Sequence, residues 1–234
     1  MTKSLFLLLA LLFIQSTTIF FLSRQNIKQL FFTFKKILSH KKNYHQKTIY
    51  KIISLIFLPG TIIHELSHFF AAIVLFLPVK DIQIFPKFKD GQIKLGQVFY
   101  VKKDFLRGIL VGVAPFFGAL FLFFGLSFFN LFPNKNLGVN ITLTYLIFTF
   151  SSLMFSSKQY LVDIGYLIPF ILFLLIIGYI FQPFIPSFNL SYFKNIIACL
   201  EFFLTNVNYY LFLSILIYLF LIQSFLLSIG KGKN

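Results

Sequence analysis

The chain carries two histidines and a glutamate within five positions of an otherwise apolar run. They are His64, Glu65 and His68, in the stretch PGTIIHELSHFFAAIVLFLP that covers residues 59–78. Side chains four positions apart on a helix lie one above the other, so the rings of His64 and His68 can bind one ion. Glu65 then reaches the water that this ion would hold. The His-Glu-x-x-His spacing is typical of zinc sites whose carboxylate acts as a general base.

The polar residues of this stretch share one face of the predicted helix. On a helical wheel Gly60, Thr61 and Ala71 fall beside the ionisable residues, and the large apolar residues occupy the opposite side. A buried ionisable group inside a membrane costs several kcal/mol unless it is paired or liganded. The stretch therefore predicts a zinc site, and the alternative is a hydrogen-bonded polar cluster that holds helices together.

The composition is that of a membrane protein. Hydrophobic residues make up 58% of the 234 residues and charged residues 12%, and the mean hydropathy is +0.87. Crossing a hydrocarbon layer takes roughly 20 apolar residues in a helix. We expect an all-α multi-pass protein with about six transmembrane helices, integral to a bacterial cell membrane. The predicted spans are residues 4–22, 52–77, 108–132, 139–155, 162–181 and 206–229.

Three parts follow from these runs. Residues 1–51 are expected to form a retained first membrane helix, the alternative being a cleaved signal peptide, and a basic interfacial helix that starts at Arg24. Residues 52–182 form the predicted catalytic membrane core, and residues 183–234 form an interfacial segment and a last transmembrane helix. Small residues at 112, 114, 118 and 119 would let another helix approach the third span closely.

Residues 79–101 predict a small β-hairpin after the zinc-binding helix. The sequence DIQIFPKFKDGQIKLGQVFYV has short alternating segments around Asp90-Gly91, the strongest hairpin signal in the chain, and Gly96 indicates a bulge or bend. The hairpin could be an ordinary connection. Alternatively its edge could hold an extended substrate by strand addition.

The formal net charge of +15 comes from lysines that cluster just outside the apolar runs. Anionic lipid headgroups account for them, and we expect no nucleic-acid partner. The single Cys199 excludes a disulfide framework and a cysteine metal site. Basic residues flank the second apolar run on both sides, at 24–51 and 79–107, and the positive-inside rule cannot favour both. The orientation of the chain in the membrane is therefore left open. The sequence also leaves the oligomeric state open.

A catalytic zinc ion normally has three protein ligands, so one more is required. The acids of the chain are Glu65, Asp81, Asp90, Asp104, Asp163 and Glu201. Asp81, Asp90 and Asp104 lie in the basic connecting segment, which leaves Asp163 and Glu201. Asp163 enters an apolar span beside a glycine, as a ligand would, although an acid there could also cap a helix start. Glu201 has the surroundings of an interfacial residue.

These residues resemble the site-2 protease family of intramembrane zinc metalloproteases. The resemblance rests on IIHELSHFFAA and, more weakly, on an acid in a later helix, and it covers the middle of the chain. It implies that His64 and His68 bind one zinc ion, that Glu65 is the general base and that Asp163 completes the site. The family's later motif commonly reads Asn-Pro-Asp-Gly or Leu-Asp-Gly, whereas this chain has Val162-Asp163-Ile164-Gly165.

The predicted function is zinc-dependent hydrolysis of peptide bonds in transmembrane or membrane-proximal protein substrates. Glu65 would accept a proton from a zinc-activated water and hand it to the leaving amine. The alternative is a non-enzymatic transporter or scaffold in which His64, Glu65 and His68 are a structural cluster. Exchange of Glu65 for Gln separates the two, because an enzyme would keep zinc and lose turnover.

Overall fold

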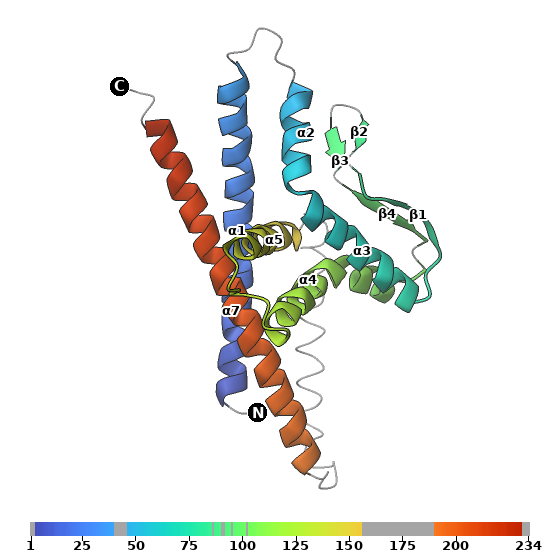
Figure 1. Cartoon of the computed structure of the whole chain (residues 1–234). Helices are drawn as coiled ribbons and strands as arrows, with labels where there is room; N and C mark the ends of the chain where they lie inside the picture. Colours follow the sequence, from blue (N-terminus) through green and yellow to red (C-terminus); the bar gives the residue numbers. More distant parts are fainter. Residues whose placement is uncertain are drawn as a thin grey trace.

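The computed structural model describes residues 3–39, 46–85, 87–89, 92–94, 96–101, 103–155 and 190–230. These residues are mostly helical, with two short antiparallel strand pairs between the third and fourth helices (Figure 1). The elements are α1 Lys3–Ser39, α2 Gln46–Ile56, α3 Leu58–Val74, β1 Val79–Gln83, β2 Lys87–Lys89, β3 Gln92–Lys94, β4 Gln97–Tyr100, α4 Phe105–Phe128, α5 Leu137–Leu153 and α7 Leu190–Gly230.

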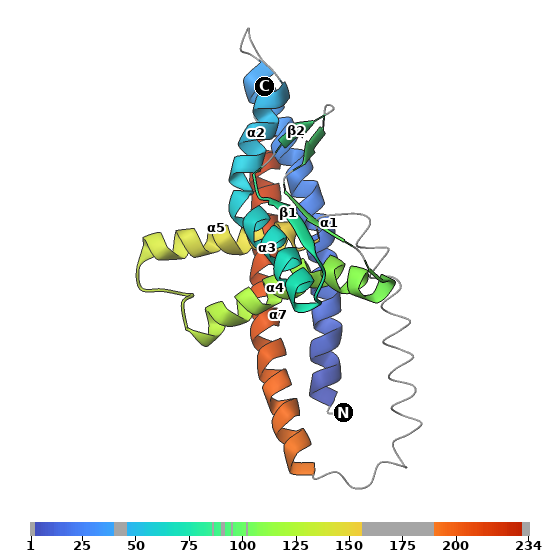
Figure 2. The ribbon, with the colours of Figure 1, turned by 90° about the vertical axis from the view of Figure 1, so that its right-hand side faces the viewer.

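The first and last helices form the long axis of the molecule. They run in the same direction and cross, with α3, α4 and α5 lying transverse to them (Figures 1 and 2). Polar side chains join the pair: Asn26 donates to the Tyr218 carbonyl at 3.3 Å and Asn208 donates to the Leu8 carbonyl at 3.0 Å. Such bonds between helices stabilise membrane bundles.

Residues 24–39 do not form the separate interfacial helix that the sequence predicts. They continue α1, which is one helix of 37 residues. The stretch contains neither glycine nor proline, so nothing in it interrupts the backbone hydrogen-bond ladder. As a result, the basic side chains from Arg24 onward are held on the same rigid rod as the first apolar run.

Three described helices are long and apolar enough to cross a membrane, namely Leu7–Leu38, Phe105–Phe128 and Asn195–Phe225. A fourth crossing results if the bent pair of α2 and α3 counts as one. The predicted fourth span is the shorter α5, and the predicted fifth span, 162–181, lies outside the described residues. The helical membrane architecture is thus supported, and the count of about six spans is not confirmed.

The predicted second span is broken at its proline. α2 and α3 meet at 68°, with Pro59 in the first turn of α3. Proline lacks the N–H that would continue the helix ladder and its ring clashes with the preceding turn. At the break the Ile56 carbonyl accepts a hydrogen bond of 2.7 Å from the hydroxyl of Tyr145, so a backbone group that the bend exposes is satisfied by α5.

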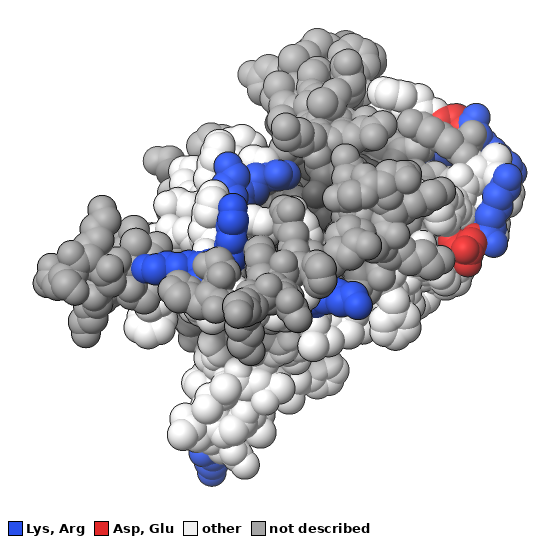
Figure 3. Space-filling view, turned by 90° about the horizontal axis from the view of Figure 1, so that it is seen from above, with Lys and Arg blue, Asp and Glu red and all other residues white. Residues whose placement is uncertain are grey.

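The bend lets the tip of the hairpin return beside α2. The β2–β3 pair lies next to α2 in two perpendicular views, whereas β1 and β4 lie beside α3 (Figures 1 and 2). Lys28, Lys36 and Lys51 before the bend and Lys80 after it are exposed. Seen from above, Lys and Arg side chains are distributed over the same face (Figure 3). Part of each basic flank thus lies toward one end of the molecule, which reduces the conflict with the positive-inside rule.

The predicted β-hairpin is confirmed as two consecutive strand pairs. β1 pairs with β4, with Val79 opposite Tyr100, and β2 pairs with β3, with Lys87 opposite Lys94. Gly96 lies between β3 and β4, at the change from one pair to the other. The tip at residues 90 and 91 is outside the described part of the chain.

Small residues hold α3 tightly between α4 and α5. A Cβ atom added to Gly60 would collide with the Thr149 carbonyl on α5, and one added to Gly118 on α4 would collide with the Ser67 hydroxyl. The close approach expected of the small residues on the third span is therefore confirmed at Gly118. Both crossings fix the helix that carries the histidines.

Candidate metal centre

The rings of His64 and His68 converge on one point. Their Nε2 atoms are 3.1 Å apart, and the rings meet edge to face with centroids 4.7 Å apart. Two nitrogens bound to one tetrahedral zinc ion at about 2.0–2.1 Å are about 3.3 Å from each other. The spacing of the pair thus fits two ligands of one ion with little adjustment.

A backbone carbonyl orients the second histidine. The Nδ1 atom of His68 lies 2.7 Å from the carbonyl oxygen of Val111 on α4. A carbonyl only accepts hydrogen bonds, so this contact assigns the proton to Nδ1 and leaves the lone pair on Nε2. Metal-binding histidines typically donate their second ring nitrogen to a carbonyl or carboxylate in this way. In the described part of the chain, Nδ1 of His64 has no hydrogen-bond partner.

Glu65 is buried beneath the hairpin. Its exposed fraction is 6%, and a Cβ atom added to Gly96 would come within 2.6 Å of its Oε1 atom. The backbone at Gly96 therefore lies directly on the carboxylate. Sequence reasoning assigned Gly96 to a bend and missed this contact, because no local pattern links two residues 31 positions apart.

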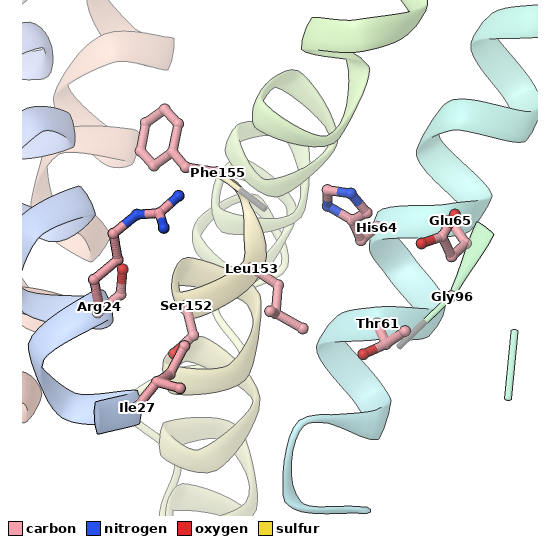
Figure 4. Close-up of a pocket in the computed structure, with 10 residues that line it drawn as sticks. Arg24, Ile27, Thr61, His64, Glu65, Gly96, Ser152, Leu153 and Phe155 are labelled. Carbon is pink, nitrogen blue, oxygen red and sulfur yellow. The ribbon is translucent and has the colours of Figure 1, made fainter. Parts of the chain in front are cut away.

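A cavity of about 280 Å³ opens beside the two α3 residues His64 and Glu65. Four elements or their connections contribute to its wall: α1, α3, α5 and the segment before β4 (Figure 4). Figure 4 places Arg24 on the α1 side and His64 and Glu65 on the α3 side. The lining residues are Ser23, Arg24, Ile27, Thr61, His64, Glu65, Gly96, Ser152, Leu153 and Phe155.

The residues that the structure describes do not supply a third metal ligand beside His64 and His68. No group of three or more His, Cys, Asp or Glu side chains gathers within that part of the chain, and Asp163 lies outside it. Glu201 accepts a hydrogen bond of 2.5 Å from Ser4 near the start of α1. Ser4 precedes Arg24 by 20 positions, which is about 30 Å along a helix. Glu201 is therefore far from the cavity, and Asp163 stays the predicted third ligand.

The donors that are present suit zinc. Two buried imidazoles supply nitrogen ligands, one of them oriented by a carbonyl, and a carboxylate stands one residue from the first. The cavity beside them leaves room for water or a substrate group. Arg24 was expected at the membrane surface, and its place in this wall follows from α1 continuing straight past its apolar run.

Comparison of the chain with known protein families, with curated proteins and with solved structures finds no match. The function is therefore inferred from the residues and their geometry.

Proposed function

We propose that the chain is an intramembrane zinc metalloprotease that cleaves peptide bonds of membrane-embedded or membrane-proximal proteins. The observation that carries the proposal is the convergence of the His64 and His68 Nε2 atoms at 3.1 Å, beside a buried Glu65 and a cavity. The resemblance of IIHELSHFFAA to site-2 proteases supports the same chemistry. Asp163 is the proposed third ligand.

The residues around the cavity would have separate roles in this reaction. His64 and His68 hold the ion, and the Val111 carbonyl keeps the His68 ring in the binding tautomer. A zinc ion in this site supplies an acidified water and polarises a carbonyl. Glu65 accepts the proton of the attacking water and delivers it to the leaving amine, a general-base and then general-acid role. Burial under Gly96 limits the positions that its carboxylate can take.

The hairpin supports the presentation of an extended substrate. A helical substrate hides its carbonyls in its own hydrogen bonds and must unwind locally before attack. In the described part of the chain β1 pairs only with β4, so the other edge of β1 could accept an added strand. The segment before β4 touches Glu65, which places the hairpin beside the general base.

Metal content and turnover, measured together, test this proposal. Purified wild-type protein is expected to contain about one zinc per chain and to cleave quenched fluorescent transmembrane peptides. His64→Ala and His68→Ala should lose both properties, and Glu65→Gln should keep zinc and lose turnover. Asp163→Ala should lose zinc. Glu201→Ala should retain it, because this matched acid lies on α7 beside the start of α1, far from the cavity. Loss of zinc in Glu201→Ala alone would reverse the ligand assignment.

A structural role is the second candidate. The His64 and His68 Nε2 atoms are also within direct hydrogen-bond distance of each other, and His68 in turn contacts the Val111 carbonyl on α4. This chain of hydrogen bonds could join α3 to α4 without an ion, as in a transporter or scaffold. In that case the purified protein contains no zinc, and Glu65→Gln leaves its behaviour unchanged.

A further inference from the structure

Arg24 brings a permanent positive charge into the cavity that holds His64 and Glu65. It lies within the candidate span Leu7–Leu38, and its side chain reaches the cavity from α1, across from α3 (Figure 4). A guanidinium group has only hydrogen-bond donors, so it needs acceptors or a counter-ion. Charges inside membrane helices are costly unless they are paired or hydrated, and they usually face a functional cavity.

No carboxylate among the described residues neutralises this charge. The guanidinium lies over the ring of Phe20, 4.5 Å from its centre, which is a favourable contact but not a counter-ion. Its Nε atom is buried without a hydrogen-bond acceptor in that part of the chain. Glu65 is the acid in the described wall of the cavity, and in the proposed reaction its carboxylate is occupied with the attacking water.

We propose that Arg24 binds a carboxylate group of the substrate, an inference that rests on the proposed protease function. A planar guanidinium matches a carboxylate with two parallel hydrogen bonds, and a fixed Arg on an aromatic ring loses little freedom in forming them. The hydroxyls of Ser23 and Ser152 line the same wall but already donate to the Phe20 and Phe148 carbonyls, so the guanidinium carries the interaction. Arg24 is thus a specificity residue for the cleavage reaction.

The size of the cavity limits where this carboxylate lies. Arg24 and Glu65 line one cavity of about 280 Å³, and an extended chain advances about 3.3 Å per residue. The carboxylate therefore lies within a few substrate residues of the reacting bond. The substrates selected are membrane peptides with Asp or Glu near the scissile bond, or peptides cleaved close to their own C-terminal carboxylate.

Peptide binding to the Glu65→Gln variant tests this without requiring turnover. The protein is placed in nanodiscs, with empty nanodiscs as the control for partitioning into lipid. The probes are dansyl-labelled apolar octapeptides that carry one internal Glu or the matching Gln. A second pair ends in a carboxylate or a carboxamide. Affinity is read by fluorescence anisotropy, and zinc content is measured on the same samples.

At least one carboxylate peptide should bind about tenfold or more tightly than its uncharged partner, the usual scale of a charge-assisted bidentate contact. Arg24→Gln should abolish the preference and Arg24→Lys should keep part of it. Lys28→Gln, one turn further along α1 and exposed, should change nothing. If tighter binding is seen only in the internal Glu pair, Arg24 binds a substrate side chain. If it is seen only in the second pair, Arg24 binds the C-terminal carboxylate of the substrate.

Equal binding of both peptides in each pair by the Glu65→Gln protein would overturn the proposal. This comparison uses one protein in which Arg24 is intact, so it does not depend on whether an Arg24 variant folds. That result is also expected if Asp163 neutralises Arg24 within the chain. Because zinc content is read separately, zinc-loaded protein without a carboxylate preference refutes the role of Arg24 alone, whereas absence of zinc refutes the protease function.

Discussion

The backbone of Gly96 lies on the carboxylate of Glu65, so the hairpin and the helix that carries His64 and His68 meet at the proposed general base. A Cβ atom at position 96 would approach the Glu65 Cγ atom to 2.5 Å and its Oε1 atom to 2.6 Å. Only a residue without a side chain allows this approach. The contact gives the hairpin a role in setting the position of Glu65 in addition to any role in substrate binding.

Replacement of Gly96 by Ala should therefore displace Glu65 while leaving the histidines in place. A misplacement of about 1 Å at a reacting group costs about a hundredfold in rate, so we expect turnover to fall by about ten- to a hundredfold. Zinc content should be unchanged, which distinguishes this effect from loss of the metal centre. Turnover equal to that of the wild type would show that Glu65 tolerates the added methyl group.

The crossing of α3 and α5 at Gly60 is predicted to be essential for stability. Gly60→Ala places a methyl group against the Thr149 carbonyl, and overpacking of this kind costs about 1–3 kcal/mol. The matched control is Gly125→Ala on α4, where a Cβ atom meets nothing within 4 Å. Exchange of Gly for Ala in an open helix position is ordinarily stabilising by up to about 1 kcal/mol.

Thermal unfolding in detergent measures the difference between these two variants. Gly60→Ala should unfold at a lower temperature than the wild type and Gly125→Ala at the same or a higher temperature. An unchanged unfolding temperature in Gly60→Ala would contradict the close crossing of the two helices.

A buried tyrosine joins α5 to α7. The hydroxyl of Tyr218 lies 3.0 Å from the Ser151 hydroxyl and 2.7 Å from that of Ser152, and the residue is fully buried. Hydrogen bonds between membrane helices contribute about 0.6–1.7 kcal/mol, so Tyr218→Phe should lower the free energy of unfolding by about that amount. Tyr209→Phe is the control, because Tyr209 is 52% exposed on the same helix. Equal stability of the two variants would contradict the assignment.

Both basic flanks of the α2–α3 pair should be accessible from the same side of the membrane. In a Cys199→Ser background, Lys51→Cys and Lys80→Cys should react with a membrane-impermeant maleimide from one side. Ser4→Cys, at the start of α1, should react with the same reagent from the other side of the membrane. By the positive-inside rule the first side is the cytoplasm. Labelling of the Lys51 and Lys80 positions from opposite sides would show that α2 and α3 form one complete crossing.

Local features of the chain could be predicted from sequence because their causes are local. The spacing of His64 and His68, the break at Pro59 and the turn signal at Asp90-Gly91 depend on helix periodicity and on proline and glycine chemistry. The structure accordingly has a histidine pair, a bend and paired strands at these places.

Contacts between distant segments could not be predicted in the same way. Arg24 has the sequence surroundings of a surface residue and enters the cavity because α1 continues unbroken. The contact of Gly96 with Glu65 depends on how the hairpin folds back over α3. The expectation of a separate interfacial helix over Arg24 to Lys51 was wrong at its start, because it rested on the charge pattern, which does not interrupt a helix. Asp163 stays a prediction, since it lies outside the described residues.

X-ray absorption at the zinc edge on active, detergent-purified protein tests the central claim most directly. We predict one zinc ion per chain with two imidazole nitrogens at about 2.0–2.1 Å, and one fewer imidazole in His68→Ala if any zinc is retained. An active preparation that contains no zinc, or zinc without imidazole ligands, would contradict the account.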